Sequence, residues 1–387
     1  MIEVNASKKH FLGMPVADFL RDYWQKKPLL IRQAFPDYQA PLSPEDLAGI
    51  ACEEGVLARL IKHDRKKDHY SIETGPFAEA IFPKLGKKDW TLLVQDMDKW
   101  DGDVRQLISA FNFLPRWRVD DVMISFAATG GSVGAHVDQY DVFLLQALGQ
   151  RRWEIDVDPD ADRSFREKTE LKLLQNFTAS IAWTLQPGDM LYLPPGVPHH
   201  GEAIDPCMTF SVGMRAPSHA ELLNDWADGL FERVSEDIRY NDKDLVAVKD
   251  NGEIDAATCQ RVLDIFKQHV PDSKEAAALF FGRFVTTYRN SMEISPPPKI
   301  PKPEKVLEQL KKGAVLEPHP FARWAWCKDG RDAVLFVQGQ SFSTTPTVAS
   351  KLARAETIGL DSFSEISASE RGLVFELIER GYLVLQK

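Results

Sequence analysis

The chain has 387 residues, of which 44% are hydrophobic and 27% charged, and its formal net charge is −10. This length exceeds what one small core needs, so two or three domains are expected. The composition is that of a globular chain rather than a disordered one. No apolar run reaches the roughly 20 residues of a membrane-spanning helix, and the N-terminus lacks the long apolar stretch of a secretory signal.

The charge and the cysteines limit the partners and the compartment. An acidic surface disfavours nonspecific binding to nucleic acid, which depends on lysine and arginine against phosphate. It favours encounter with a basic partner, or simply gives solubility. The cysteines have no paired spacing and favour a reducing compartment over a disulfide framework or a thiolate zinc site. We therefore expect a cytoplasmic protein that neither enters a membrane nor binds nucleic acid directly.

The first part of the chain, to about Lys88, mixes short helical and strand-like pieces. A helix is predicted over Pro15–Trp24 and a strand over residues 28–31. Ser43 is suited to cap a second helix, with Pro44 at the first helical position, where its missing N–H costs nothing. The pattern predicts an α/β elaboration ahead of the main domain.

From Trp117 to Arg215 the pattern becomes that of closely spaced strands. Runs rich in β-branched and aromatic residues recur between Gly and Pro turns, and they cover Val122–Phe126, Asp141–Leu145, Ile181–Thr184, Met190–Leu193 and Met208–Val212. Strands at this density predict an all-β barrel or sandwich. The polar and charged segment Asp158–Phe177 is predicted to be an insertion between strands.

After Pro217 the pattern is helical. Ser218 can cap a helix through about Val234, and further helices fit Ala256–His269 and Ser273–Arg289. Their apolar residues favour a homodimer interface, although packing on the barrel is an alternative.

The proline-rich segment 295–303 is predicted to be a linker. Beyond it, a helix over Glu304–Lys312 and a strand over Ala333–Gln338 are followed by alternating pieces to Lys387. This tail has the size of a small helix-and-wing domain.

A pair of motifs within the strand-rich region predicts a metal site. A glycine-rich turn at 130–134 precedes His136 and Asp138, and in an extended chain side chains i and i+2 share one face. A proline-rich turn at 194–198 precedes His199. Two histidines and one carboxylate on one face of a metal leave three positions open, which is the geometry of non-haem Fe(II) oxygenases. The open positions admit a bidentate co-substrate and dioxygen.

Each motif alone is common and usually structural, so the prediction depends on their joint occurrence in one strand-rich region. Two histidines are adjacent at the second motif. We favour His199 as the ligand because His200 would point to the opposite side of an extended segment.

These motifs resemble the JmjC-type branch of the 2-oxoglutarate oxygenases and, more closely, the bacterial ribosomal oxygenases that hydroxylate an arginine of a large-subunit ribosomal protein. The resemblance covers nearly the whole chain. The segments that carry it are Trp24–Pro28, Trp90–Val94, Trp117–Ser125, His136–Phe143, Gly149–Trp153 and Gly188–Pro195.

The resemblance implies a mixed α+β fold. A double-stranded β-helix, the jelly-roll barrel of JmjC and cupin proteins, would be followed by a helical dimerisation segment and a small winged-helix-like domain. The implied boundaries are 1–216 for the barrel with its N-terminal elaboration, 217–294 for the helical segment, 295–303 for the linker and 304–387 for the last domain. It also implies Fe(II), 2-oxoglutarate as co-substrate and O2, and a homodimer that hydroxylates Cβ of an arginine in a basic ribosomal protein.

The resemblance further implies co-substrate contacts. Arg151 matches the arginine that pairs with the distal carboxylate of 2-oxoglutarate, and a planar guanidinium suits a carboxylate. Arg152 is the alternative, because only one of two neighbouring strand residues can enter the barrel. Ser125 matches a hydroxyl that helps to hold the same co-substrate.

The substrate side is less defined by the sequence. An arginine substrate needs an acidic or hydrogen-bonding pocket, for which Asp120, Gln139, Tyr140 and Ser211 are the candidates. A purely structural role is an open alternative for each.

Two other functions remain compatible with these motifs. The chain could hydroxylate or demethylate another protein residue, as other JmjC proteins do. It could also be a non-enzymatic metal-dependent sensor with a winged-helix tail, although Phe342–Lys387 has no concentrated basic stripe.

Overall fold

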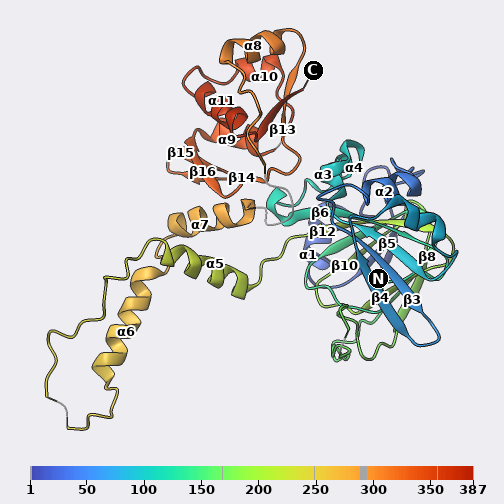
Figure 1. Cartoon of the computed structure of the whole chain (residues 1–387), viewed down its shortest axis with the longest axis horizontal. Coiled ribbons are helices and arrows are strands. Elements are labelled where there is room, and N and C mark those ends of the chain that lie inside the picture. The colour runs from blue at the N-terminus through green and yellow to red at the C-terminus, as the bar shows by residue number, and fades with distance from the viewer. Residues whose placement is uncertain (1, 168, 248, 288–293, 355, 387) are drawn as a thin grey trace. The chain divides into compact units, whose positions relative to one another are not determined.

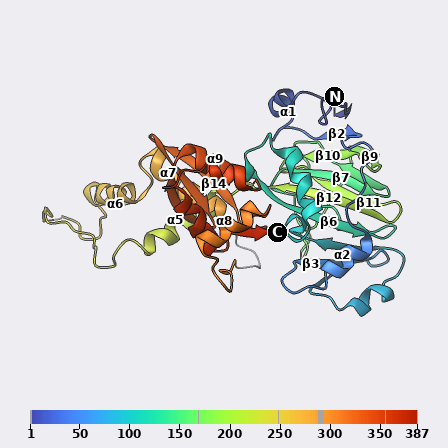
Figure 2. The same cartoon turned by 90° about the horizontal axis from the view of Figure 1, so that it is seen from above.

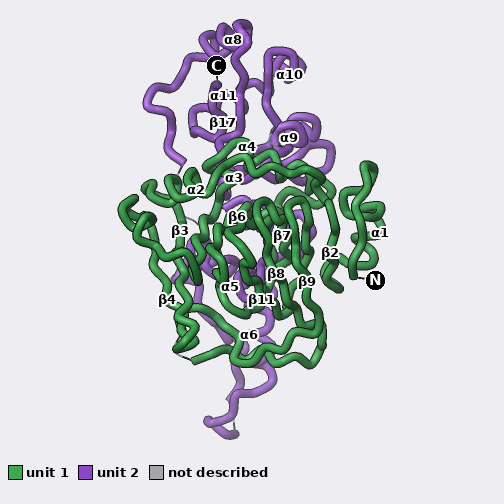
Figure 3. Tube along the Cα trace, turned by 90° about the vertical axis from the view of Figure 1, so that its right-hand side faces the viewer, with its two compact units in different colours: residues 1–216, 290–293 green, residues 217–289, 294–387 purple. Residues whose placement is uncertain are grey.

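The computed structural model divides into two compact units, coloured separately in Figure 3. Unit 1 comprises residues 1–216 with 290–293, and unit 2 comprises residues 217–289 with 294–387. Within the described part of the chain, no helix has the length and apolar character needed to cross a bilayer. The structure describes residues 2–167, 169–247, 249–287, 294–354 and 356–386.

Unit 1 is built on two β-sheets (Figures 1 and 2). Along the larger sheet the strands follow in the order β1 (Glu3–Asn5), β2 (Leu29–Arg32), β10 (Met190–Leu193), β7 (Val142–Leu148), β12 (Cys207–Met214), β6 (Val119–Ala127), β5 (Trp90–Val94), β3 (Ala58–Asp64) and β4 (His69–Thr74). The smaller sheet has the order β11 (His199–Ala203), β8 (Arg151–Ile155) and β9 (Ile181–Leu185). Apart from the parallel pair β1–β2, neighbouring strands are antiparallel, which agrees with the predicted barrel.

Alternation along the strands gives each face of the larger sheet its own role. In β6 the side chains of Val122 and Ile124 are fully buried in the main hydrophobic core. The side chains of Asp121, Met123 and Ser125 belong to the opposite set and line a cavity. Because successive side chains of a strand point to opposite faces, one strand serves both the core and the site.

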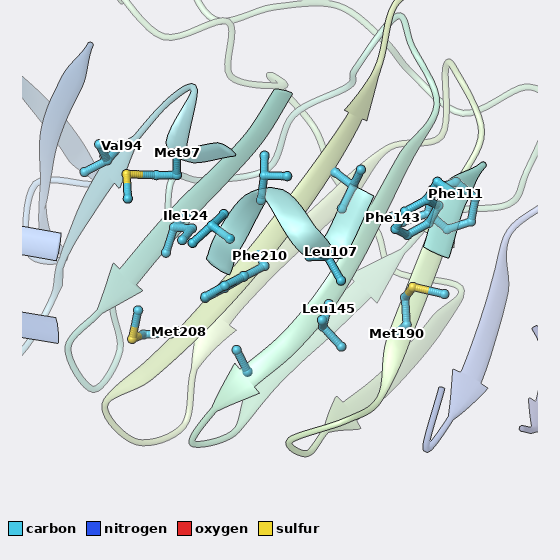
Figure 4. Packing of buried hydrophobic residues seen from close by; sticks show 14 of the residues in the cluster. Val94, Met97, Leu107, Phe111, Ile124, Phe143, Leu145, Met190, Met208 and Phe210 are labelled. Carbon is cyan, nitrogen blue, oxygen red and sulfur yellow. The ribbon is translucent and has the colours of Figure 1, made fainter. Parts of the chain in front are cut away.

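The main core of unit 1 lies between the larger sheet and the N-terminal helices. These helices are α1 (Val16–Asp22), α2 (Pro44–Ile50), α3 (Met97–Trp100) and α4 (Gly102–Gln106). Figure 4 shows Ile124, Phe210, Leu145 and Met190 on the sheet with Leu107 and Phe111 against them. Ser43 caps α2 through a capping box with Asp46, and Pro44 is at the start of the helix, as predicted.

The opposite face of the larger sheet packs against the smaller sheet. Leu144 and Leu191 from the larger sheet form a second hydrophobic cluster with Trp153, Ile155 and Leu185 from the smaller one. A cavity between the two sheets is lined in part by Leu144 and Trp153 of this cluster.

A buried polar network connects the start of β7 to the N-terminal region. The Asp141 carboxylate is fully buried and accepts hydrogen bonds from Tyr192 at 2.6 Å, Gln25 at 2.9 Å and Arg118 at 2.8 Å. A buried carboxylate is stable only when its oxygens are paired in this way. The network fixes the chain immediately after the predicted metal-binding segment.

We expect Asp141→Ala to lower the free energy of unfolding by about 3–5 kcal/mol, because it leaves the guanidinium of Arg118 buried without its carboxylate. Urea unfolding followed by tryptophan fluorescence measures the change. The control is Asp22→Ala, which removes an exposed ion pair with Arg21 and should leave the free energy of unfolding almost unchanged. Equal losses in both variants would contradict the role of the network.

Unit 2 begins with three helices, α5 (His219–Phe231), α6 (Ala256–His269) and α7 (Lys274–Thr286). They confirm the three predicted helices, except that the predicted end at Arg289 lies outside the described residues. The second half of α7 is buried against β14 (Trp324–Asp329) and β15 (Asp332–Val337), where Gly282 lets the ring of Phe336 approach its backbone.

The rest of unit 2 is a small α/β domain with its own core. A sheet of β14, β15 and β16 (Gln340–Thr344) accompanies the antiparallel pair β13 (Val315–Pro318) and β17 (Leu383–Gln386). Its helices are α8 (Pro303–Lys311), α9 (Pro346–Ala353), α10 (Leu360–Ser364) and α11 (Arg371–Glu379). This combination of short helices and a β-wing agrees with the predicted winged-helix-like domain.

Candidate metal centre and substrate cavity

A cavity of about 430 Å³ lies between the two sheets of unit 1 and carries most of the predicted site residues. Apolar walls with a few converging polar groups are the usual form of a small-molecule site. The predicted residues that line it are Asp120, Ser125, His136, Asp138, Tyr140, Arg151, His199 and Ser211.

His136, Asp138 and His199 converge on one point of this cavity. One ligand atom from each lies within 4.8 Å of the other two. His199 Nε2 is 3.6 Å from Asp138 Oδ2, and His136 Nε2 is 4.0 Å from the same oxygen. Side-chain atoms at this separation can share a single metal ion, so the structure brings the three residues of the predicted metal site together.

The backbone explains why two histidines separated by 62 intervening residues meet. The His136 N–H donates to the His199 carbonyl at 3.0 Å, and the His199 N–H donates to the His136 carbonyl at 3.0 Å. The segments that carry them are also joined by the N–H of Gly196, which donates to the carbonyl of Asp138 at 2.8 Å. The two turns therefore form a short antiparallel ladder across the cavity.

Hydrogen bonds also orient the two imidazoles. His136 Nδ1 lies 3.0 Å from the carbonyl of Gly134, and His199 Nδ1 lies 2.9 Å from that of Val197. A carbonyl accepts, so each Nδ1 carries the proton, and the lone pair of each Nε2 faces Asp138. Outer partners of this kind fix the tautomer of metal-binding histidines.

Burial distinguishes His199 from its neighbour. His199 is 2% exposed, and burial followed by the proximity of His136 lowers its pKa, so the ring is neutral and able to donate its lone pair to a metal. His200 instead lies 3.4 Å from the Glu154 carboxylate and does not line the cavity.

Arg151 is a buried cation that lines the same cavity. It is 3% exposed, and within the described residues no carboxylate lies within 4.0 Å of its guanidinium. Its NH1 and NH2 make weak contacts with Ser125 Oγ at 3.4 Å and with the Gly201 carbonyl at 3.3 Å, and its Nε has no partner. Burial lowers its pKa. Its guanidinium carbon also lies 5.2 Å from the centre of the Trp153 ring. A buried guanidinium without a carboxylate partner is costly, so the site suits a carboxylate ligand.

Strand alternation decides between the two arginines of β8. Arg151, Trp153 and Ile155 are buried on one face of the strand. Arg152 is exposed and pairs with Glu154 at 2.9 Å on the other face. Ser125 is buried beside Arg151, as the prediction requires.

Asp96, Asp120 and Asp121 line one part of the cavity, which we call its acidic side. The sequence prediction missed Asp121. Asp121 is largely buried, and burial raises the pKa of its carboxyl to about 7 despite the lowering influence of Lys99. Among the described residues no cationic side chain lies within 4.0 Å of it. The signal was in the sequence, because Asp121 has the same strand parity as Ser125 and Met123.

The four predicted substrate residues have different positions. Ser211 is buried in the cavity wall, Asp120 is exposed and lines the cavity, and Tyr140 is 43% exposed at the cavity with its pKa raised by desolvation and then by Asp138. Gln139 is exposed and is not part of the cavity lining.

The predicted insertion at 158–177 lies between β8 and β9 and contributes to the cavity. Leu173 is buried and lines it, and the N–H of Leu174 donates to the carbonyl of Ala135 beside the metal-binding segment. Arg166 pairs with Asp68, which ties the insertion to the β3–β4 hairpin. Residues 171–173 of the insertion are therefore part of the cavity wall.

The donor set fits a non-haem iron centre with a dicarboxylate co-substrate. Two neutral imidazoles and one carboxylate are the facial set of Fe(II) oxygenases. The orphaned Nε of Arg151 provides a separate anchor for an anion.

Comparisons with known proteins agree with this geometry. Residues 106–222 match the model of the JmjC domain family, and residues 267–384 match that of the ROXA-like winged helix. The chain is 36% identical to the ribosomal protein uL16 3-hydroxylase of Escherichia coli (strain K12), over 77% of this chain and 79% of that protein. It is 40% identical to a probable ribosomal oxygenase of Haemophilus influenzae, over 59% and 56%.

Solved structures extend the likeness to both units. The X-ray structure of E. coli ycfD has a TM-score of 0.85 at 31% identity, and the match covers 97% of this chain and 99% of that one. The structure of that ribosomal oxygenase with cobalt and 2-oxoglutarate gives 0.84 over the same shares. The chain belongs to the JmjC-type ribosomal oxygenases, which use Fe(II), 2-oxoglutarate and dioxygen.

Proposed function

We propose that this oxygenase hydroxylates Cβ of an arginine side chain in a basic ribosomal protein of the large subunit. The observation that carries the proposal is the largely buried Asp121 carboxylate, which faces the cavity without a cationic partner among the described residues. A guanidinium is the natural partner for such a carboxylate. The name of the E. coli relative adds support, because it is a uL16 3-hydroxylase and carbon 3 of an amino acid is Cβ.

His136, Asp138 and His199 are the proposed iron ligands, and Arg151 with Ser125 the proposed 2-oxoglutarate contacts. When bound, the iron supplies oxygen activation coupled to decarboxylation of the co-substrate. The residues of the chain bind and orient. The bond from each imidazole Nδ1 to a carbonyl holds the ligand set, and Arg151 receives a carboxylate in a site shielded from water.

We assign substrate contacts to the acidic side of the cavity. Asp121 would pair with the guanidinium, with Asp120, Tyr140 and Ser211 nearby in the lining. Gln139, which is exposed outside the lining, is left without a proposed contact. The net charge of −10 favours encounter with a basic ribosomal protein through long-range attraction.

Mass spectrometry of the ribosomal protein after incubation with the enzyme, Fe(II) and 2-oxoglutarate tests the proposal. We expect a gain of one oxygen atom on an arginine, located to Cβ by fragmentation and amino-acid analysis. Loss of a methyl group, which the demethylase alternative requires, or oxygen on another residue type would overturn it. Omitting 2-oxoglutarate is the matched control.

We also propose that the helices of 217–294 form a homodimer interface. The amphipathic helices α5 and α6 contain no buried residue. Large apolar side chains are exposed on or beside them, with Leu223 at 68%, Phe231 at 83% and Phe266 at 65%. Exposed apolar area on this scale marks a protein interface, and a second copy presents a matching apolar surface.

We expect Phe266→Glu to shift the protein from dimer to monomer, because a carboxylate in an apolar interface loses its hydration without gaining a partner. Light scattering coupled to size-exclusion chromatography measures the mass. Lys267→Glu, at the neighbouring exposed position, is the control and should remain dimeric. A dimeric Phe266→Glu variant, or a monomeric unaltered protein, would exclude this interface.

A further inference from the structure

A buried lysine lies behind the acidic side of the cavity. Lys99, on the short helix α3, is 6% exposed, and its ammonium nitrogen lies 2.5 Å from Asp96 Oδ1 and 3.5 Å from Asp98 Oδ2. Asp98 Oδ1 in turn accepts the backbone N–H of Val122 at 2.9 Å. An ammonium that loses its hydration needs such partners, and the hydrogen bond from Val122 joins this charged cluster to β6.

Two contacts of this network lead to Asp121. Lys99 Nζ donates to the backbone carbonyl of Asp120, which directly precedes Asp121, at 3.3 Å. The backbone N–H of Asp96, whose carboxylate Lys99 holds, donates to Asp121 Oδ2 at 3.1 Å. Together with the bond to Val122, these contacts fix β6 on both sides of Asp121 and fix the carboxylate itself.

Asp121 is influenced by three neighbouring carboxylates and by one neighbouring ammonium group. The groups that act on it are Lys99, Asp96 and Asp98 from the α3 turn and Asp120 beside it. The other titratable side chains that line its cavity are Arg59, His136, Asp138, Tyr140, Arg151, Lys172 and His199. Burial first, and then the three neighbouring carboxylates, raise the pKa of Asp121, whereas Lys99 lowers it. Among these neighbours on the α3 turn and β6, Lys99 is the one whose charge opposes protonation of Asp121.

We infer that Lys99 is a positioning residue of the substrate pocket, which fixes Asp121 and favours the charged form of its carboxylate so that the pocket accepts a cationic side chain. Lys99 does not line the cavity and acts only through Asp121 and its neighbours. The inference rests on the proposed function, because it takes the guanidinium of an arginine as the ligand of Asp121.

The test measures the Kd of a fluorescent arginine-containing peptide from the ribosomal protein between pH 6 and 9, by anisotropy. In the unaltered enzyme, affinity should rise as pH increases through about 7, where Asp121 becomes charged. Lys99→Met raises the pKa of Asp121 and moves this midpoint to higher pH. At pH 6 binding then weakens about tenfold for each unit of that rise.

Asp98→Asn gives the opposite sign. It removes a negative charge that raises the pKa of Asp121, while the amide oxygen still accepts the N–H of Val122. The midpoint should therefore move to lower pH. A purely structural role of Lys99 predicts weaker binding at every pH and no shift of the midpoint in either variant.

Three controls complete the experiment. Lys99→Arg keeps the charge and should restore the midpoint, Lys351→Met removes a lysine of unit 2 and should leave it unchanged, and Asp121→Asn should abolish the effect of Lys99→Met. Midpoints that do not move, or that move in the same direction, overturn the inference. If Lys99→Met does not fold, an unmoved Asp98→Asn midpoint overturns it alone. Failure of the unaltered enzyme to hydroxylate arginine overturns instead the proposed function.

Discussion

Replacing His199 by alanine is expected to remove iron binding and hydroxylation, whereas the same change at the adjacent His200 leaves both. His199 is buried with its Nε2 facing Asp138, and its Nδ1 is held by the Val197 carbonyl. His200 lies outside the cavity lining and contacts Glu154. The loss in His199→Ala should exceed about a hundredfold, because losing even an outer partner of a ligand costs 10–100-fold in metal affinity or activity.

Two measurements separate binding from chemistry. Iron content after anaerobic loading, determined by elemental mass spectrometry, reports the ligand directly, and succinate release with substrate reports turnover. Thermal unfolding of both variants controls for folding. Full iron content in His199→Ala, or its loss in His200→Ala, would reverse the proposed assignment. His199 and His200 are neighbours on one strand and are both changed to alanine. The two variants therefore differ mainly in the direction in which the lost side chain pointed.

The metal centre was predictable because its geometry is encoded locally. His136 and Asp138 are two residues apart in extended chain, and the turn ahead of His199 sets its direction. The ladder that brings His136 to His199 across 62 intervening residues is not local. That meeting was predicted from the joint occurrence of the two motifs in one strand-rich region, and the backbone pairing that achieves it was not predicted.

The alternation of side chains along a strand accounts for two cavity residues that were predicted and one that was missed. Arg151 and Ser125 were predicted to enter the barrel, and both are buried at the cavity. Asp120 was named as a substrate candidate and Asp121 was not, although Asp121 has the parity of Ser125. The burial of Asp121 comes from the α3 turn, more than 20 residues earlier in the chain, and neither strand period nor motif reveals that contact.

The helices show the same limit of sequence patterns, which do not reveal contacts between segments far apart in the chain. The segments after Pro217 were predicted from helical spacing. Ser218 caps α5 as predicted, α6 begins at the predicted residue Ala256, and α7 begins directly after Ser273, the first residue of the predicted range. Spacing alone does not separate helices that pack internally from those that remain exposed. The second half of α7 is buried, whereas α5 and α6 contain no buried residue.

Arg151→Met is expected to raise the KM for 2-oxoglutarate about a hundredfold, since a hydrogen bond to a charged group contributes about 1.5–3 kcal/mol. The same change should leave the protein without co-substrate as stable as before or more stable. In that state the guanidinium is buried with only weak contacts and one nitrogen without a partner, and replacing a buried charge by an apolar side chain of similar size is often neutral or stabilising.

Thermal unfolding with and without 2-oxoglutarate measures both effects, because a ligand that binds only the folded state raises the midpoint with its concentration. The unaltered protein should gain stability from 2-oxoglutarate, and Arg151→Met should start equal or higher and gain little. Arg152→Met is the matched control, because Arg152 is exposed and pairs with Glu154 on the other face of β8. It should respond to 2-oxoglutarate like the unaltered protein. A lower starting midpoint in Arg151→Met together with a full response would mean that the guanidinium supports the fold and that the co-substrate carboxylate is held elsewhere.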